Sequence, residues 1–111
     1  MNVIHLNLEN LREITGGDKE IEFELFEEYK TSSKNLLGVL QSCIHEDNEK
    51  WRETAHALKG ISVLLGADYL GSLAKTAQEQ KEAAADQKQK MYDSMIEAHI
   101  IVLQKIDAEM N

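Results

Sequence analysis

The sequence contains no proline, a single cysteine, Cys43, and only 5 % aromatic residues. Without proline no helix is broken from within, and the abundant Ala, Leu, Glu, Lys and Gln favour helix. We therefore expect an all-α protein with no sheet. One cysteine cannot form an internal disulfide, and Cys43 falls on a predicted apolar stripe, where a small core residue is the simplest interpretation.

Positive charge is also scarce, with 12 Lys and Arg residues against 20 Asp and Glu and a net charge of −8. This balance argues against nucleic acid and anionic membranes as partners, because both require a basic face. No stretch approaches the ~20 apolar residues of a membrane span, and the N-terminus lacks the pattern of a signal peptide. We expect a cytoplasmic monomer of one domain, residues 1–111, whose partner is another protein.

Capping signals and apolar spacing predict five helical segments. Asn7 is expected to cap a short helix carrying Leu8, Leu11 and Ile14, which ends at Gly16 and Gly17. Asp18 is expected to cap a long helix that runs to about Glu46. Its predicted core positions are Leu25, Phe26, Tyr29, Ser32, Leu36, Leu37, Leu40, Cys43 and Ile44.

Asp47 or Asn48 is expected to cap the third helix, which is predicted to end at Gly66. The fourth begins at Ala67 or Asp68, with inward positions at Leu70, Leu73, Ala77 and Ala84. After a turn within 83–86, the last helix carries Tyr92, Met95, Ile96, His99, Val102, Leu103 and Ile106. Short connections between long helices predict an antiparallel up-down-up-down four-helix bundle, with the short N-terminal helix across one end.

The third segment has a core face and an outer face. At about 100° per residue, one narrow stripe contains Trp51, Ala55, Leu58, Ser62 and Leu65. His56 lies roughly 150° from the centre of that stripe, and Gly60 lies nearly opposite it. Lys59 and Arg52 fall to one side, and Val63 and Leu64 fall on the outer half.

Gly60 is an unusual choice for the interior of a helix, because it costs roughly 1 kcal/mol relative to alanine. It follows His56 by one turn, where a side chain would crowd the imidazole. Together with the apolar Val63 and Leu64, it predicts a surface on which another protein docks around His56.

The run A-H-A-L-K-G-I-S-V-L-L-G-A at residues 55–67 resembles the signature of histidine-containing phosphotransfer (HPt) domains. The resemblance extends through Leu70, Leu73 and Gln78, and upstream through Leu8, Leu11, Gly16, Gly17, Asp18 and Phe26. It covers about two thirds of the chain in order and spacing. Two positions depart from the family pattern: Ile61 stands where a small residue is more frequent, and Ala77 where leucine is frequent.

The resemblance implies a helical bundle in which His56 is the phosphoacceptor, exchanging a phosphoryl group with receiver domains of response regulators, including those of hybrid histidine kinases. It implies that Gln78 orients the imidazole and that Lys59 offers its ammonium group to phosphoryl oxygens. Arg52, Gly60, Val63 and Leu64 would form the docking surface. The chain has no Gly-rich phosphate-binding loop, so we expect a phosphocarrier that is not an enzyme and has no cofactor, the Mg²⁺ being held by the receiver.

The sequence leaves one alternative function open and argues against a second. A scaffolding bundle could bind a signalling protein while His56 plays no chemical part. A di-iron site is suggested by the E-x-x-H spacing of Glu53 and His56, but it requires a second such motif facing inward, and the spacing of Glu97 and His99 is wrong. His5, His45 and His99 are interpreted as structural or surface residues. Met1 and the compact length favour a free-standing protein, while the cognate receiver and the direction of phosphate flow stay open.

Overall fold

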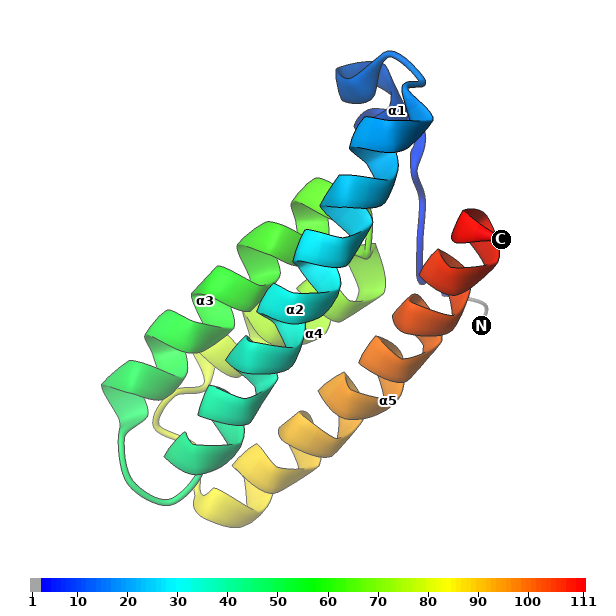
Figure 1. The fold of residues 1–111 in the computed structure, drawn as a ribbon. Helices are drawn as coiled ribbons and strands as arrows, with labels where there is room; N and C mark the ends of the chain where they lie inside the picture. Colours follow the sequence, from blue (N-terminus) through cyan, green and yellow to red (C-terminus); the bar gives the residue numbers. More distant parts are fainter. Residues whose placement is uncertain (1–2) are drawn as a thin grey trace.

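The computed structural model describes residues 3–111, and within that range it contains helices and no strand (Figure 1). The expected all-α class is confirmed. The helices are α1 (Glu9–Thr15), α2 (Lys19–Cys43), α3 (Asn48–Leu65), α4 (Asp68–Glu79) and α5 (Ala85–Met110).

The four longer helices contact one another in a closed ring. Helix α3 packs against α2 and α4, and α5 packs against the same two helices from the other side (Figure 1). Helix α1 contacts α2 and α3. The buried apolar side chains form one cluster at the centre. This is the packing of a helical bundle, and none of the helices within residues 3–111 is both long and apolar enough to span a membrane.

Most helix ends lie where the sequence predicted them. The Asp18 carboxylate accepts hydrogen bonds from the backbone N–H groups of Glu20 and Ile21. The Asp47 carboxylate accepts one from Lys50 N at 2.9 Å, so Asp47 is the cap of α3. Asn7 is not the N-cap of α1, which is Leu8, but its side chain accepts from Glu9 N at 3.1 Å.

Gly66 ends α3 with φ +104°, as predicted, and it also admits the N-terminal segment. Asn7 N donates to Gly66 O at 2.9 Å. A Cβ atom on Gly66 would lie 1.9 Å from Asn7 O. Both the backbone conformation and this close approach therefore require glycine.

The prediction for α2 was wrong in two respects. The helix ends at Cys43 and not at Glu46, because residues 44–46 form a tighter turn in which Glu46 N donates to Cys43 O at 3.3 Å. Its buried face is also rotated from the predicted stripe. Phe26, Leu37 and Leu40 are buried as expected, whereas Leu25, Ser32 and Leu36 are only partly buried. The rotation arises because α2 packs against α3 and α5 at once.

Three smaller predictions also require correction. Ile14 is 70 % exposed, because α1 has only two turns and covers the core with Leu8 and Leu11. Leu73 is only partly buried, and Ala84 is exposed because α4 ends at Glu79 and residues 80–84 form the turn.

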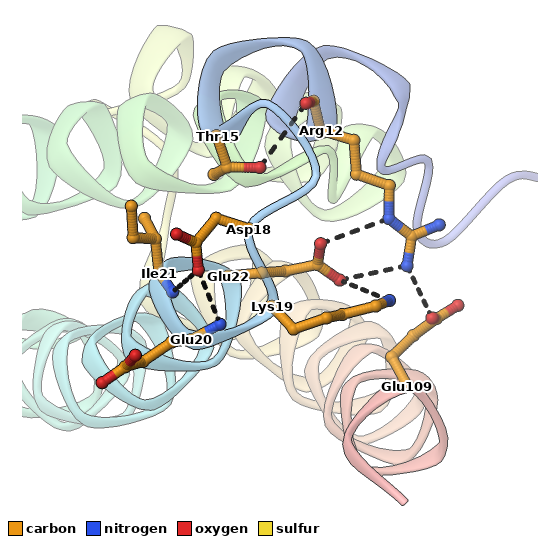
Figure 2. Close-up of polar contacts among 8 residues, drawn as sticks. All are labelled: Arg12, Thr15, Asp18, Lys19, Glu20, Ile21, Glu22 and Glu109. Atoms are coloured by element: carbon orange, nitrogen blue, oxygen red, sulfur yellow. Dashed lines mark hydrogen bonds and ion pairs between the residues drawn. The ribbon is translucent and has the colours of Figure 1, made fainter.

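An ion-pair network around a buried carboxylate, which sequence reasoning missed, joins three helices through Arg12 (Figure 2). Glu22 on α2 is fully buried, and Arg12 on α1 donates to it from Nη2 at 3.0 Å and from Nε at 3.4 Å. The same Nη2 donates to Glu109 on α5 at 2.7 Å, and Lys19 Nζ lies 3.9 Å from Glu22. These carboxylates raise the pKa of Arg12, the Glu22 hydrogen bond most strongly. The network fastens α1 to the ends of α2 and α5.

Candidate phosphoacceptor site on α3

The buried stripe of α3 fixes which of its residues face outward. Trp51, Ala55, Leu58, Ser62 and Leu65 are all buried, as the sequence predicted. Trp51 Nε1 donates to Ala77 O at 2.8 Å, which ties α3 to α4. Tyr29 and Ser62 share a hydrogen bond of 2.9 Å, which ties α3 to α2. Helix α3 is therefore held on both sides, and its opposite face is presented outward.

His56 lies on this outward face and is exposed. Its Nδ1 is 3.3 Å from Gln78 Oε1 on α4. Because a carbonyl oxygen only accepts, Nδ1 is the nitrogen that carries the proton when the imidazole is neutral. The lone pair is then on Nε2, which is the nitrogen left for another group.

The neighbouring cations differ in their surroundings. Lys59, one turn after His56, is half-buried. Arg52, one turn before it, donates from Nε at 2.9 Å and from Nη2 at 2.6 Å to Glu49 Oε1. Lys81 Nζ lies 3.5 Å from Glu49 Oε2. The Arg52 hydrogen bond is the main cause that lowers the pKa of Glu49, and Glu49 in turn raises the pKa of Arg52.

The surface beyond His56 is open and apolar. Gly60 is exposed, and a Cβ atom built on it meets no atom within 4 Å. Val63 is 52 % exposed and Leu64 is 62 % exposed. Val63 also packs against α4, since its Cγ2 lies 2.9 Å from the position of a Cβ on Gly71. The structure thus brings Gln78 to His56 and leaves Arg52, Lys59, Gly60 and Leu64 on or beside the same face.

A family model described as Hpt domain matches residues 24–108. The chain belongs to the Hpt domain family. Hpt domains take part in histidine phosphotransfer within phosphorelays, where they interact with receiver domains and act as phosphocarriers without kinase activity. No curated protein and no solved structure matched the chain. Leu8, Leu11 and the Gly16-Gly17-Asp18 turn, which the resemblance included, lie upstream of the matched residues.

The other histidines of this Hpt domain lie in different surroundings. His99 on α5 is buried, its Nε2 is 2.8 Å from Ser33 Oγ, and burial lowers its pKa. His5 is partly buried and packs edge-on against Tyr69 with ring centroids 5.2 Å apart. His45 is exposed in the turn after α2. Among the described side chains, none of these three histidines is hydrogen-bonded to a side-chain amide, as His56 is to Gln78.

The spacing of Glu53 and His56 does not produce an inward-facing pair, because both side chains are exposed. Within residues 3–111 no three His, Cys, Asp or Glu side chains are grouped closely enough to hold a metal ion.

Besides the buried Glu22, one further feature of this Hpt domain was not predicted from the sequence. An apolar cavity of about 250 Å³ lies where α1, α2 and α3 meet, and Leu64 places it beside the outward face of α3. Its lining includes Leu11, Ile14, Leu25, Tyr29, Ile61 and Leu64. The available signal was Ile61, an apolar residue that departs from the family pattern and lines this cavity.

Proposed function

We propose that His56 accepts a phosphoryl group from the aspartyl phosphate of a response-regulator receiver domain and passes it to another receiver. The observation that carries the proposal is the exposed imidazole whose Nδ1 is held by Gln78 at 3.3 Å, which leaves Nε2 as the nucleophile. The membership of the chain in the Hpt family supports the same reaction.

In the proposed step the Nε2 lone pair attacks phosphorus while the bond from phosphorus to the aspartyl oxygen breaks. The aspartate leaves as a carboxylate, and the imidazole, still protonated at Nδ1, becomes positively charged. Gln78 Oε1 accepts the Nδ1 hydrogen bond, which strengthens as that charge develops. Lys59 offers its ammonium group to the phosphoryl oxygens. Any Mg²⁺ belongs to the receiver, so this chain needs no cofactor of its own.

Docking requires an approach of about 3–3.5 Å between Nε2 and phosphorus. The open space at Gly60 and the exposed Leu64 support a partner seated directly over this part of α3. We assign Arg52 and Val63 to the rim of the same surface. The receiver domains of hybrid histidine kinases are among those that such a surface would accept.

We also propose the finer description of the molecule. Residues 1–111 would form one domain, an up-down-up-down four-helix bundle with α1 across one end. It would act in the cytoplasm as a monomer, with receivers as partners and without nucleic acid or membrane. The closed ring of helix contacts and the net charge of −8 support this description.

The test is phosphotransfer from a panel of ³²P-labelled receivers. The parent protein should acquire acid-labile label, and His56→Gln should remain folded and acquire none. His45→Gln is the matched control, because it changes another exposed histidine and should label normally. With ATP alone, no variant should be labelled. Label that persists in His56→Gln would refute the assignment, and receiver binding without transfer would favour the scaffolding alternative.

A further inference from the structure

We propose that Arg52 becomes a ligand of the phosphoryl group on phosphorylated His56, and that Arg52 is bound by Glu49 while His56 is unmodified. This rests on the proposed function, because it assumes a phosphoryl group on Nε2. It adds a second cation to the site besides Lys59, and it makes the Glu49 ion pair a switch between two states.

The seam between α3 and α4 brings these groups together. On α3, Glu49, Arg52 and His56 follow one another at intervals of one turn. Beside them lie Gln78 on α4 and Lys81, which comes three residues later. Two contacts join the rows: His56 Nδ1 to Gln78 Oε1 at 3.3 Å, and Glu49 Oε2 to Lys81 Nζ at 3.5 Å. The guanidinium of Arg52 therefore lies one turn from the imidazole, on the side of α3 that faces α4.

Arg52 is within reach of a group on Nε2. Residues four apart on a helix have Cβ atoms about 5–6 Å apart. Helical side chains also lean toward the N-terminus, so the His56 imidazole covers the turn that contains Arg52. The proposal therefore requires a change of the Arg52 side-chain rotamer and no movement of the backbone.

The present ion pair is suited to exchange. Arg52 Nε and Nη2 both donate to one oxygen, Glu49 Oε1. The strongest pairing of arginine with a carboxylate has two parallel hydrogen bonds, one to each oxygen, and this pair lacks it. A phosphoryl group offers three oxygens and a charge near −2. When Arg52 leaves, Glu49 keeps Lys81 on Oε2, so its carboxylate is not left unpaired. The pair is also exposed, with 35 % of the Arg52 side chain and 54 % of the Glu49 side chain accessible, so little desolvation opposes the exchange.

The first test observes the exchange directly by NMR. Phosphoramidate phosphorylates histidine by transfer to nitrogen with loss of ammonia, so it modifies the protein without a receiver. Phosphorylation should shift the Arg52 Nε–H resonance and raise the carboxyl pKa of Glu49 toward its ordinary value. His56→Gln treated in the same way should show neither change. An unchanged Arg52 resonance in protein with phosphorylated His56 would overturn the proposal.

The second test measures the equilibrium between phosphorylated His56 and one phosphorylated receiver. Arg52→Gln should shift it about two- to fivefold toward the receiver, the range expected for an exposed charge pair. Glu49→Gln should shift it toward His56, and should have no effect when Arg52 is already glutamine. Glu27→Gln is the matched control. Glu27 forms the same kind of i,i+3 ion pair, with Lys30 on α2, and the substitution removes the same negative charge at a position outside α3.

The outcomes separate the two proposals. If receivers label His56 normally and Arg52→Gln leaves the equilibrium unchanged, the role of Arg52 is wrong and the proposed function stands. Equal shifts from Glu49→Gln and Glu27→Gln would also overturn it, since general charge would then explain both. If no receiver labels His56, the proposed function fails, and this inference fails with it.

Discussion

Substitution of Gly60 distinguishes most clearly whether the outward face of α3 binds a partner or is unused. We predict that Gly60→Ala stabilises the protein while slowing phosphotransfer, and that Gly60→Gln slows it further. The first effect arises because glycine in a helix interior costs about 1 kcal/mol relative to alanine. Nothing lies within 4 Å of the added Cβ, so no clash offsets this gain.

Gly38 on α2 is the matched control. Gly38 also lies inside a helix and is exposed. Apart from the adjacent backbone of its own helix, no atom lies within 4 Å of a Cβ added there. Gly38→Ala should therefore stabilise the protein by a similar amount, about 1 kcal/mol. It should leave phosphotransfer unchanged, because Gly38 is an exposed residue of α2 and does not belong to the outward face of α3.

The rate effect follows from the approach that transfer requires. A partner held back by about 1 Å can lose on the order of 10²-fold in rate. Urea unfolding measures the stability of each variant, and rapid-quench transfer from a phosphorylated receiver measures the rate. If Gly60→Gln transferred the phosphoryl group at the parental rate, the proposal that a receiver docks over Gly60 would be wrong. Unfolding of Gly60→Gln would instead show that this position packs against the core.

Three further predictions concern stability. Gly66→Ala should lose at least about 2 kcal/mol in urea unfolding, because its Cβ would meet Asn7 O at 1.9 Å and its φ is +104°; a loss below 0.5 kcal/mol would contradict this. Arg12→Gln should cost about 2–3 kcal/mol by leaving the buried Glu22 carboxylate without its main partner, and the double variant that also carries Glu22→Gln should recover part of it. Burial lowers the pKa of His99, so below about pH 6.5 the unfolded chain takes up a proton that the folded chain does not. The free energy of unfolding should fall between pH 7 and pH 5.5, and His99→Gln should reduce that fall; equal slopes would refute the reasoning.

The sequence by itself determined the features that depend on local rules. The caps at Asp18 and Asp47 and the left-handed Gly66 were predictable, because each satisfies backbone groups within a few residues of itself. The exposed position of His56 was predictable for a related reason. The buried stripe of α3 is narrow, so the rotation of the helix about its axis determines which of its residues are buried and which are exposed.

Tertiary structure decided what depends on two or more helices at once. Helix α2 lies between α3 and α5, and its hydrogen bonds from Tyr29 to Ser62 and from Ser33 to His99 set a rotation that its own periodicity does not contain. The burial of Glu22 likewise depends on an arginine ten residues away on another helix. The contact between His56 and Gln78 needs the register of α4 against α3, which Trp51 and Ala77 O hold in place. Periodicity describes one helix at a time, whereas register arises from packing between helices.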